Sequence, residues 1–220
     1  MRIQILSCQR KHTLRVVKEA AERRNEILDT AEKLFITKGY DKTSTNDILD
    51  RVGIARGTLY YHFKSKEEIL NAMIERINGA LITKAKTIAS DTSIPVIDRI
   101  VMTIAALNVD TDIGHEIIDE VHKPQNALMH QKMQENLVAG IVPILTDLVC
   151  EGEKQGLFNI RYPAETIEML VLYACTAFDD RYETDGAAKE KRIKVFLYNT
   201  EKLLGAEEGS LQKAMINLFR

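Results

Sequence analysis

The side chains from Arg56 to His62 (RGTLYYH) are of types that could contact a nucleic acid. Arginine can donate two hydrogen bonds to a guanine edge, whereas threonine, tyrosine and histidine can donate to phosphate oxygens and also offer apolar surface. Gly57 would let the backbone approach DNA closely. The alternative is an ordinary amphipathic helical hairpin, but adjacent exposed tyrosines beside arginine and histidine would be unusual there. The composition therefore favours a DNA-contacting helix.

These side chains need a scaffold, and residues 44–63 have the pattern of two short helices joined by a tight turn. Ser44 is a candidate N-cap, and Asp47 follows three residues later in a looser version of the capping-box spacing. The first helix is therefore predicted from about Thr45 to Val52. Gly53 follows where a left-handed residue would end that helix at little cost.

The second helix is predicted to begin near Ala55, and Leu59 and Phe63, four residues apart, mark its buried side. This layout is a helix-turn-helix, whose second helix enters the DNA major groove. We expect phosphate contacts from side chains that carry hydrogen-bond donors, namely Thr45, Tyr60, His62 and Lys66. We expect base contacts from the outward-facing residues Arg56, Gly57, Thr58 and Tyr61.

The run from Ile27 to Ile69 resembles the DNA-binding region of the TetR family of bacterial transcription regulators. The matching residues are Ala31, Leu34, Phe35, Gly39, Tyr40, Thr43, Ile48, Val52, Gly53, Ile54, the run Gly57 to Phe63, and Ser65, Lys66 and Glu67. The match covers about a fifth of the chain, and Leu49 departs from it because the family usually has a small residue there. The resemblance implies a homodimer that binds a palindromic operator on double-stranded DNA, most often as a repressor. The remaining sequence matches only in general shape, so neither the ligand nor the target DNA is implied.

Composition predicts an all-α protein, because the 220 residues include no Trp and only 4 Pro. We expect a three-helix helix-turn-helix DNA-binding domain at residues 16–65. A long helix would join it to a larger helical ligand-binding and dimerisation domain at residues 66–220. Residues 1–15 are interpreted either as a disordered arm that touches DNA or as sequence upstream of the real start, and we favour the second interpretation.

Charge is distributed unevenly along the chain, whose formal net charge is −2. Residues 1–75 carry 14 Lys and Arg against 11 Asp and Glu, a net +3, and the remainder carries 16 against 21, a net −5. A mildly basic N-terminal part fits local contact with DNA. The 3 cysteines lack metal-type spacing, which favours reduced thiols in the cytoplasm. The sequence has no uninterrupted apolar run of the ~18 residues that span a membrane, so no membrane partner is predicted.

Apolar spacing predicts the remaining helices. They are expected over residues 16–37, from Ser65 to about Ala89, over 96–108 and 112–122, from Pro124 to 152 with a kink or division at Pro143, and over 164–182, 187–204 and 211–219. The helix from Ser65 would start in the DNA-binding domain and end in the next. The helix over 164–182 is apolar nearly all round, which predicts burial on all sides. We interpret it and the helix over 187–204 as a homodimer interface, with an ordinary core as the alternative.

A cavity between the helices of the second domain is the expected site for a small-molecule effector. The candidate lining residues are Met102, Ile104, Leu107, His115, Ile118, His122, Met129, Met133, Tyr173 and Phe178. The sequence contains no nucleophile–base pair, Gly-rich phosphate loop or HExxH motif, so neither catalysis nor a cofactor is predicted.

His115, Asp119 and His122 share one face of a predicted helix, and they could form a metal site or simply a polar face. The favoured function is a DNA-binding transcriptional regulator, a repressor that a small molecule releases from its operator. Two alternatives remain open. One is a metal-sensing regulator, and the other is a DNA-bound structural or cell-division factor that takes no ligand.

Overall fold

The computed structural model describes residues 20–107, 122–178 and 186–215. Every regular element within these ranges is a helix, which confirms the predicted all-α class. The helices are α1 (Ala20–Lys38), α2 (Thr45–Val52), α3 (Arg56–His62), α4 (Lys66–Ala89), α5 (Val96–Ala105), the 3-10 turn η1 (Pro124–Asn126), α7 (Ala127–Lys154), α8 (Pro163–Ala177), α9 (Gly186–Leu204) and α10 (Ser210–Met215). Residues 1–15 and most of the helix predicted over 112–122 lie outside the described residues.

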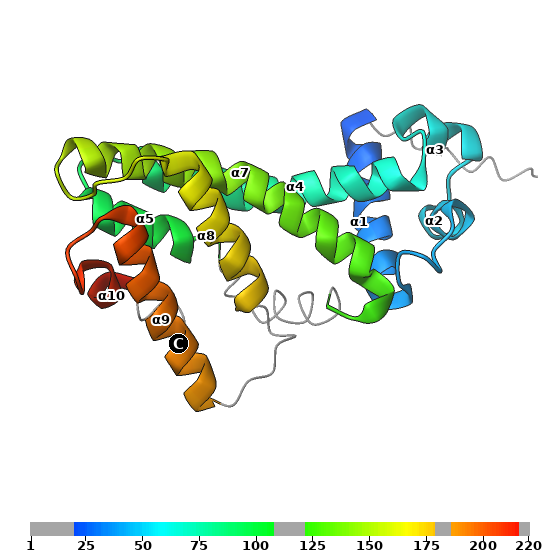
Figure 1. Ribbon diagram of the computed structural model, residues 1–220. Coiled ribbons are helices and arrows are strands. Elements are labelled where there is room, and N and C mark those ends of the chain that lie inside the picture. The colour runs from blue at the N-terminus through cyan, green and yellow to red at the C-terminus, as the bar shows by residue number, and fades with distance from the viewer. Residues whose placement is uncertain (1–19, 108–121, 179–185, 216–220) are drawn as a thin grey trace, which may run out of the picture.

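The N-terminal domain consists of α1, α2, α3 and the first turns of α4, packed around one core (Figure 1). Helix α1 buries Ile27, Leu28, Ala31 and Phe35, which recur every three or four residues and so form one apolar stripe. The Phe35 ring meets the edge of the Tyr40 ring with centroids 5.2 Å apart. This contact fixes the turn that leads from α1 into the helix-turn-helix.

Helix α4 belongs to both domains, as the sequence predicts. Its N-cap is Ser65, whose hydroxyl accepts a hydrogen bond from the N–H of Glu68 at 3.0 Å. Ile69 and Met73 of α4 lie in the N-terminal core, whereas Ala85 lies in the core of the C-terminal domain. One rigid element therefore connects the two domains, and Figure 1 shows α7 running beside it.

The C-terminal domain surrounds α7, which packs against α4, α5 and α8. Helix α7 is continuous through Pro143, so of the two alternatives predicted there, a kink or a division, the division is wrong. A proline removes one backbone hydrogen bond, but tertiary packing can hold a helix together across it. That packing is close, because a Cβ added at Gly140 would lie 2.7 Å from Cδ1 of Ile82 on α4.

The segment Pro124–Lys154 is long and apolar enough, by length and composition alone, to cross a membrane. The sequence analysis does not predict this segment, because its criterion is an uninterrupted apolar run. The apolar residues of α7 are instead shared with other helices: Ile141, Leu145 and Leu148 lie in the C-terminal core. Burial against other helices gives these three side chains an apolar environment without lipid, and 33% of the apolar window is buried inside the structure.

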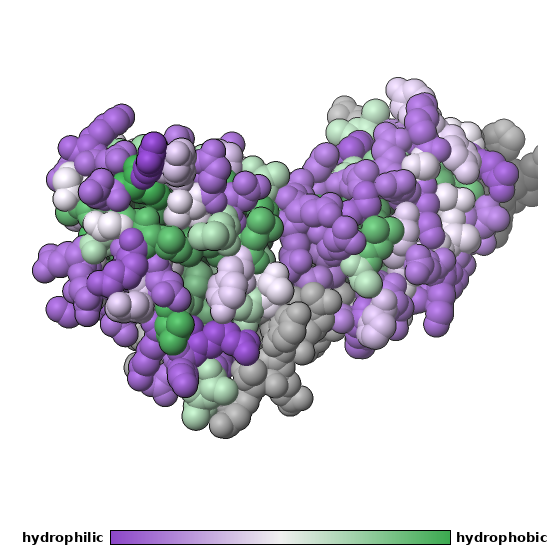
Figure 2. All heavy atoms as spheres, in the orientation of Figure 1, coloured by the Kyte–Doolittle hydropathy of each residue, from purple (hydrophilic) through white to green (hydrophobic). Residues whose placement is uncertain are grey.

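Helices α8 and α9 present large apolar side chains to solvent. Only Ile167 and Leu170 of α8 are buried, so the prediction that α8 is buried on all sides is wrong for the single chain. The half-exposed apolar residues of the two helices are Met169, Leu172, Tyr173, Val195, Tyr198 and Leu203. Figure 2 shows apolar residues gathered over the C-terminal domain, whereas the N-terminal domain is largely hydrophilic on the same face.

Candidate nucleic-acid interface and ligand cavity

The start of α2 is fixed by a capping box, as predicted. Ser44 Oγ accepts a hydrogen bond from the backbone N–H of Asp47 at 3.1 Å, and Asp47 Oδ2 accepts one from the N–H of Ser44 at 2.7 Å. The ammonium of Lys38 lies 2.8 Å from the same carboxylate oxygen. The Lys38 hydrogen bond and then those from Ser44 hold the pKa of Asp47 well below its ordinary value of 3.8. These contacts tie the end of α1 to the beginning of α2.

The turn between α2 and α3 has the predicted left-handed glycine. Gly53 has φ 74°, and its N–H donates to the carbonyl of Leu49 at 2.8 Å. Leu49, the departure from the family pattern, is itself buried in the N-terminal core. Leu59 and Phe63 anchor α3 in that core with about 1% of their surface exposed. The turn and these two anchors determine which side of α3 faces outward.

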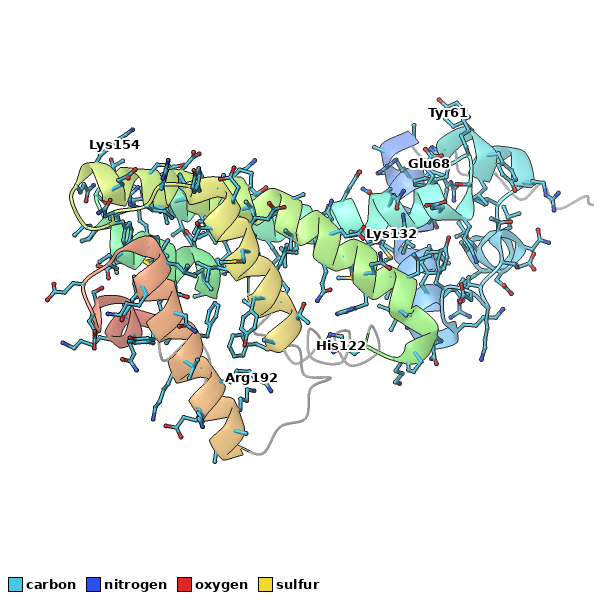
Figure 3. The ribbon with its side chains drawn as sticks, viewed as in Figure 1. Tyr61, Glu68, His122, Lys132, Lys154 and Arg192 are labelled. Atoms are coloured by element: carbon cyan, nitrogen blue, oxygen red, sulfur yellow. The ribbon has the colours of Figure 1, made fainter. Side chains whose placement is uncertain are left out.

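The outward side of α3 carries the residues predicted to contact DNA. Arg56, Gly57, Tyr60 and Tyr61 are exposed, and Tyr61 is 73% exposed. Figure 3 shows Tyr61 projecting from α3 at the upper edge of the N-terminal domain. A Cβ at Gly57 would meet no atom within 4 Å, so the backbone there is open to a close partner. Thr58 and the α2 residue Thr45 are half-buried.

Arg56 is held by a residue that the sequence pattern does not single out. Its Nη2 donates to Oδ1 of Asn46 at 3.1 Å, which links α3 to the exposed side of α2. Asn46 adjoins Thr45, which was predicted to contact DNA. This position in the sequence is the one feature that could have identified Asn46. A guanidinium already oriented by one acceptor loses less conformational freedom when it forms further hydrogen bonds.

His62 and Lys66 lie at the other end of the helix-turn-helix. Burial, followed by the nearby charges of Arg24 and Arg23, lowers the pKa of His62, which favours a neutral imidazole at pH 7. The ammonium of Lys66 lies over the Tyr40 ring and donates to the Tyr40 carbonyl at 2.9 Å. An ammonium has three donors, so Lys66 retains others for a phosphate.

A cavity of about 300 Å³ lies in the C-terminal domain among α5, α7, α8, α9 and α10. Three of the residues predicted to line an effector site, Ile104, Leu107 and Phe178, line this cavity. Met102 and Tyr173 do not line it and are about half exposed. Alpha-helical periodicity identifies an apolar face, but it does not say which part of that face borders a void.

The remaining predicted pocket residues lie elsewhere or outside the described residues. Met129 is a buried member of the N-terminal core, and Met133 packs against that core. Both are on the N-terminal half of α7, which extends beyond the cavity toward α1 and α4. The ring of His122 lies 4.8 Å from that of His130 near the start of α7 (Figure 3). His115 and Ile118 lie outside the described residues.

The metal prediction rests mostly on residues outside the described ranges, because only His122 of the three candidates is described. Within the ranges that the structure covers, no group of three or more His, Cys, Asp or Glu side chains is placed to hold a metal ion.

Two family profiles match separate parts of this chain. The profile described as "Bacterial regulatory proteins, tetR family" matches residues 27–73, and that of a tetracyclin repressor-like C-terminal domain matches residues 108–185. Together they span more than half of the sequence, and the first covers the whole helix-turn-helix described above. The chain belongs to the TetR family.

Relatives with sequence similarity include the HTH-type transcriptional repressor KstR2 of Mycobacterium tuberculosis, which is 35% identical over 81 residues. That match covers 37% of this chain and 40% of KstR2. The HTH-type transcriptional regulator TtgR of Pseudomonas putida is 26% identical over 141 residues, covering 64% of this chain and 60% of TtgR. Each match therefore spans less than two thirds of the relative's length.

Among solved structures, GusR of Salmonella enterica has a similar fold, with a TM-score of 0.58 at 19% identity. The comparison covers 86% of this chain and 99% of GusR. The similarity of fold therefore extends beyond the helix-turn-helix into the C-terminal domain.

Proposed function

We propose that this TetR-family protein is a homodimeric, DNA-binding transcriptional regulator of the cytoplasm, a repressor whose operator affinity falls when a small molecule occupies the C-terminal cavity. The observation that carries the proposal is the exposed side of α3, where Arg56, Gly57 and Tyr61 face outward from a rigidly capped helix-turn-helix. Such a surface matches the recognition helix that enters a major groove.

The exposed apolar residues of α8 and α9 support a dimer. Leu172 and Tyr198 are each almost half exposed, and side chains of this size are usually buried when they are grouped. A twofold interface between two copies of these helices would bury them in a four-helix bundle. It would also present two α3 helices to successive major grooves, about 34–36 Å apart or slightly more, on a palindromic site.

The contacts between α7 and α4 support control by a ligand. Ile141 and Leu145 of α7 line the cavity, and α7 packs against α4 along much of its length. Buried Asn78 of α4 donates to the carbonyl of Met133 at 2.9 Å and to Oδ1 of Asn136 at 3.0 Å. A ligand that displaces α7 would therefore displace α4 and the N-terminal domain with it. The shift in DNA affinity is limited by the ligand's differential affinity for the two states, typically ~1–3 kcal/mol.

The test is selection of bound sequences from random double-stranded DNA by the full chain, followed by native mass spectrometry of the complex. We expect enrichment of a palindrome and a mass of two chains per DNA duplex. Failure to enrich any sequence at low salt would exclude a sequence-specific regulator. Enrichment with one chain per duplex would retain DNA recognition and reject the homodimer.

A further inference from the structure

The wall of the C-terminal cavity is almost entirely hydrocarbon. Of the described residues that line it, Thr200 supplies a hydroxyl and Cys175 a thiol, and no Asp, Glu, Lys, Arg or His is among them. The hydroxyl of Thr200 already donates to the carbonyl of Phe196 at 2.9 Å, so it offers a ligand little more than an acceptor. A ligand in this space would exchange water for apolar contacts.

Two charged side chains near the described wall, those of Glu201 and Arg192, have other hydrogen-bond partners. Glu201 is 1% exposed, and its carboxylate accepts hydrogen bonds from the backbone N–H groups of Gly209, Leu211 and Gln212 at 2.9, 2.9 and 2.8 Å. This carboxylate therefore serves to cap α10. Arg192 donates to the carbonyl of Ala177 at 3.0 Å, at the end of α8 and outside the cavity lining.

A charge placed against the described part of the wall would therefore lose its water without gaining a charged partner there. Burial of an unpaired ion in an apolar environment costs far more than burial of a neutral group of the same size. The described wall residues thus disfavour carboxylates, phosphates and ammonium groups, whichever apolar body carries them.

The volume of the cavity and the aromatic rings in its wall limit the class of ligand further. The cavity of about 300 Å³ is at the lower end of small-molecule sites, which is enough room for one or two fused rings. The phenyl rings of Phe178 and Phe196 form an edge-to-face pair in the wall, with centroids 5.3 Å apart. Rings in this arrangement pack well against a further aromatic ring.

We infer that this cavity binds an uncharged, largely apolar molecule the size of one or two rings. The inference deepens the proposed function, because such a molecule would be the effector of the regulator. Binding to the wall itself does not depend on DNA recognition, so the two can be tested separately.

The experiment titrates the full chain, without DNA, with two fluorescent probes that share one skeleton. 1-Naphthylamine has two fused rings and is uncharged at pH 7, whereas 8-aminonaphthalene-1-sulfonate has the same rings and carries a sulfonate. We expect saturable binding of the neutral probe at one per chain, about tenfold or more tighter than that of the anionic probe. Equal or tighter binding of the anionic probe would overturn the inference.

Variants distinguish the cavity from the exposed faces of α8 and α9. Ala174 lines the cavity, so Ala174→Phe should fill it and reduce neutral-probe affinity about tenfold or more. Ala164→Phe makes the same change at an exposed position of α8 and should leave binding intact. If circular dichroism shows that Ala174→Phe is unfolded, Val171→Phe fills the cavity by a smaller change. Unchanged binding by a folded cavity-filling variant would overturn the inference.

An acidic molecule with its tail in the cavity and its charge on Arg192 is the main competing occupant. If such a molecule were the ligand, Arg192→Gln would selectively lower the affinity for the anionic probe. Our inference predicts that Arg192→Gln changes the affinity for neither probe appreciably. If the neutral probe does not bind but the protein still selects an operator, the proposed ligand class is rejected and the proposed DNA-binding function stands. If the neutral probe binds but no operator is selected, the proposed DNA-binding function is rejected and the ligand class stands.

Discussion

The side chain of Asn126 joins the two domains at a point separate from α4. Its Oδ1 accepts a hydrogen bond from the backbone N–H of Tyr40 at 3.2 Å, across 86 residues of sequence, and Asn126 is completely buried. Beside it, Gln125 lies against Gly39, which has φ 91°. The 3-10 turn before α7 is therefore fastened to the turn between α1 and α2. This contact adds a second connection between the cavity domain and the DNA-binding domain.

Replacement of Asn126 should destabilise the protein more than the loss of so small a side chain would by itself. Asn126→Ala would leave the buried N–H of Tyr40 without this acceptor, at a cost of about 1–3 kcal/mol in the free energy of unfolding. Urea denaturation measures the loss. The control is Asn25→Ala at an exposed position of α1, where alanine should be neutral or slightly stabilising. Equal effects of the two substitutions would contradict the proposed importance of the contact.

The sequence predicted the helix-turn-helix well because its signals are local. Ser44, Asp47 and Gly53 act within a few residues of themselves, so the bounds of α2 and the form of the turn could be derived before any packing was known. The contact between Asn126 and Tyr40 could not, because its partners meet only once the two domains have packed. Met129 illustrates the same difficulty: its apolar character predicted burial, but which of the two cores buries it depends on where α7 crosses the N-terminal domain.

Arg56→Ala should weaken operator binding by about 1–3 kcal/mol and relax base preference near its contact. The exposed guanidinium, oriented by Asn46, motivates this prediction. Fluorescence anisotropy on the selected operator and on single-base variants measures both effects. Arg161→Ala removes an exposed arginine from the C-terminal domain and should leave DNA affinity unchanged. An Arg56→Ala protein with full affinity and specificity would remove Arg56 from the base contacts.

The capping carboxylate should make stability depend on pH in the acid range. Because the folded-state pKa of Asp47 is depressed below 3.8, its stabilising contribution is present above that value and is lost as the pH falls through the folded-state pKa. The stability difference between wild type and Asp47→Asn should therefore be largest near pH 7 and shrink as the pH falls below about 4.

Urea titrations at low ionic strength from pH 7 downward test this, because salt screens the exposed contact with Lys38. Asp50→Asn, on the exposed side of the same helix, measures the effect of removing a carboxylate from α2 without removing its cap. A stability difference for Asp47→Asn that stays constant across the acid range would show that the carboxylate charge contributes nothing to the cap.

Leu172→Glu should weaken the proposed dimer at least about tenfold, because it would place a charge within an apolar interface. Sedimentation equilibrium of the full chain measures the dissociation constant. Leu157→Glu makes the same change at an exposed leucine in the turn after α7 and should have little effect. If the dimer tolerates Leu172→Glu but not Leu157→Glu, the interface does not lie on the exposed faces of α8 and α9.

At the close crossing of α4 and α7, the effect of Gly140→Ala on the free energy of unfolding depends on the neighbouring residue Ile82. Alanine normally stabilises a helix by about 0.5–1 kcal/mol relative to glycine. At Gly140, however, the added Cβ would lie 2.7 and 2.8 Å from Cδ1 and Cγ1 of Ile82. Overpacking of this kind typically costs about 1–3 kcal/mol, so Gly140→Ala should be destabilising overall.

In the background of Ile82→Ala, the same Gly140→Ala substitution should become neutral or stabilising, because the obstructing side chain is gone. Gly79→Ala on α4 is the matched control, since a Cβ there meets no atom within 4 Å and should simply stabilise the helix. Urea denaturation of the four proteins in the cycle gives the coupling between the two positions. Strict additivity would mean that α4 and α7 separate easily at this crossing. Such freedom would weaken the physical basis for transmitting a displacement of α7 to the DNA-binding domain.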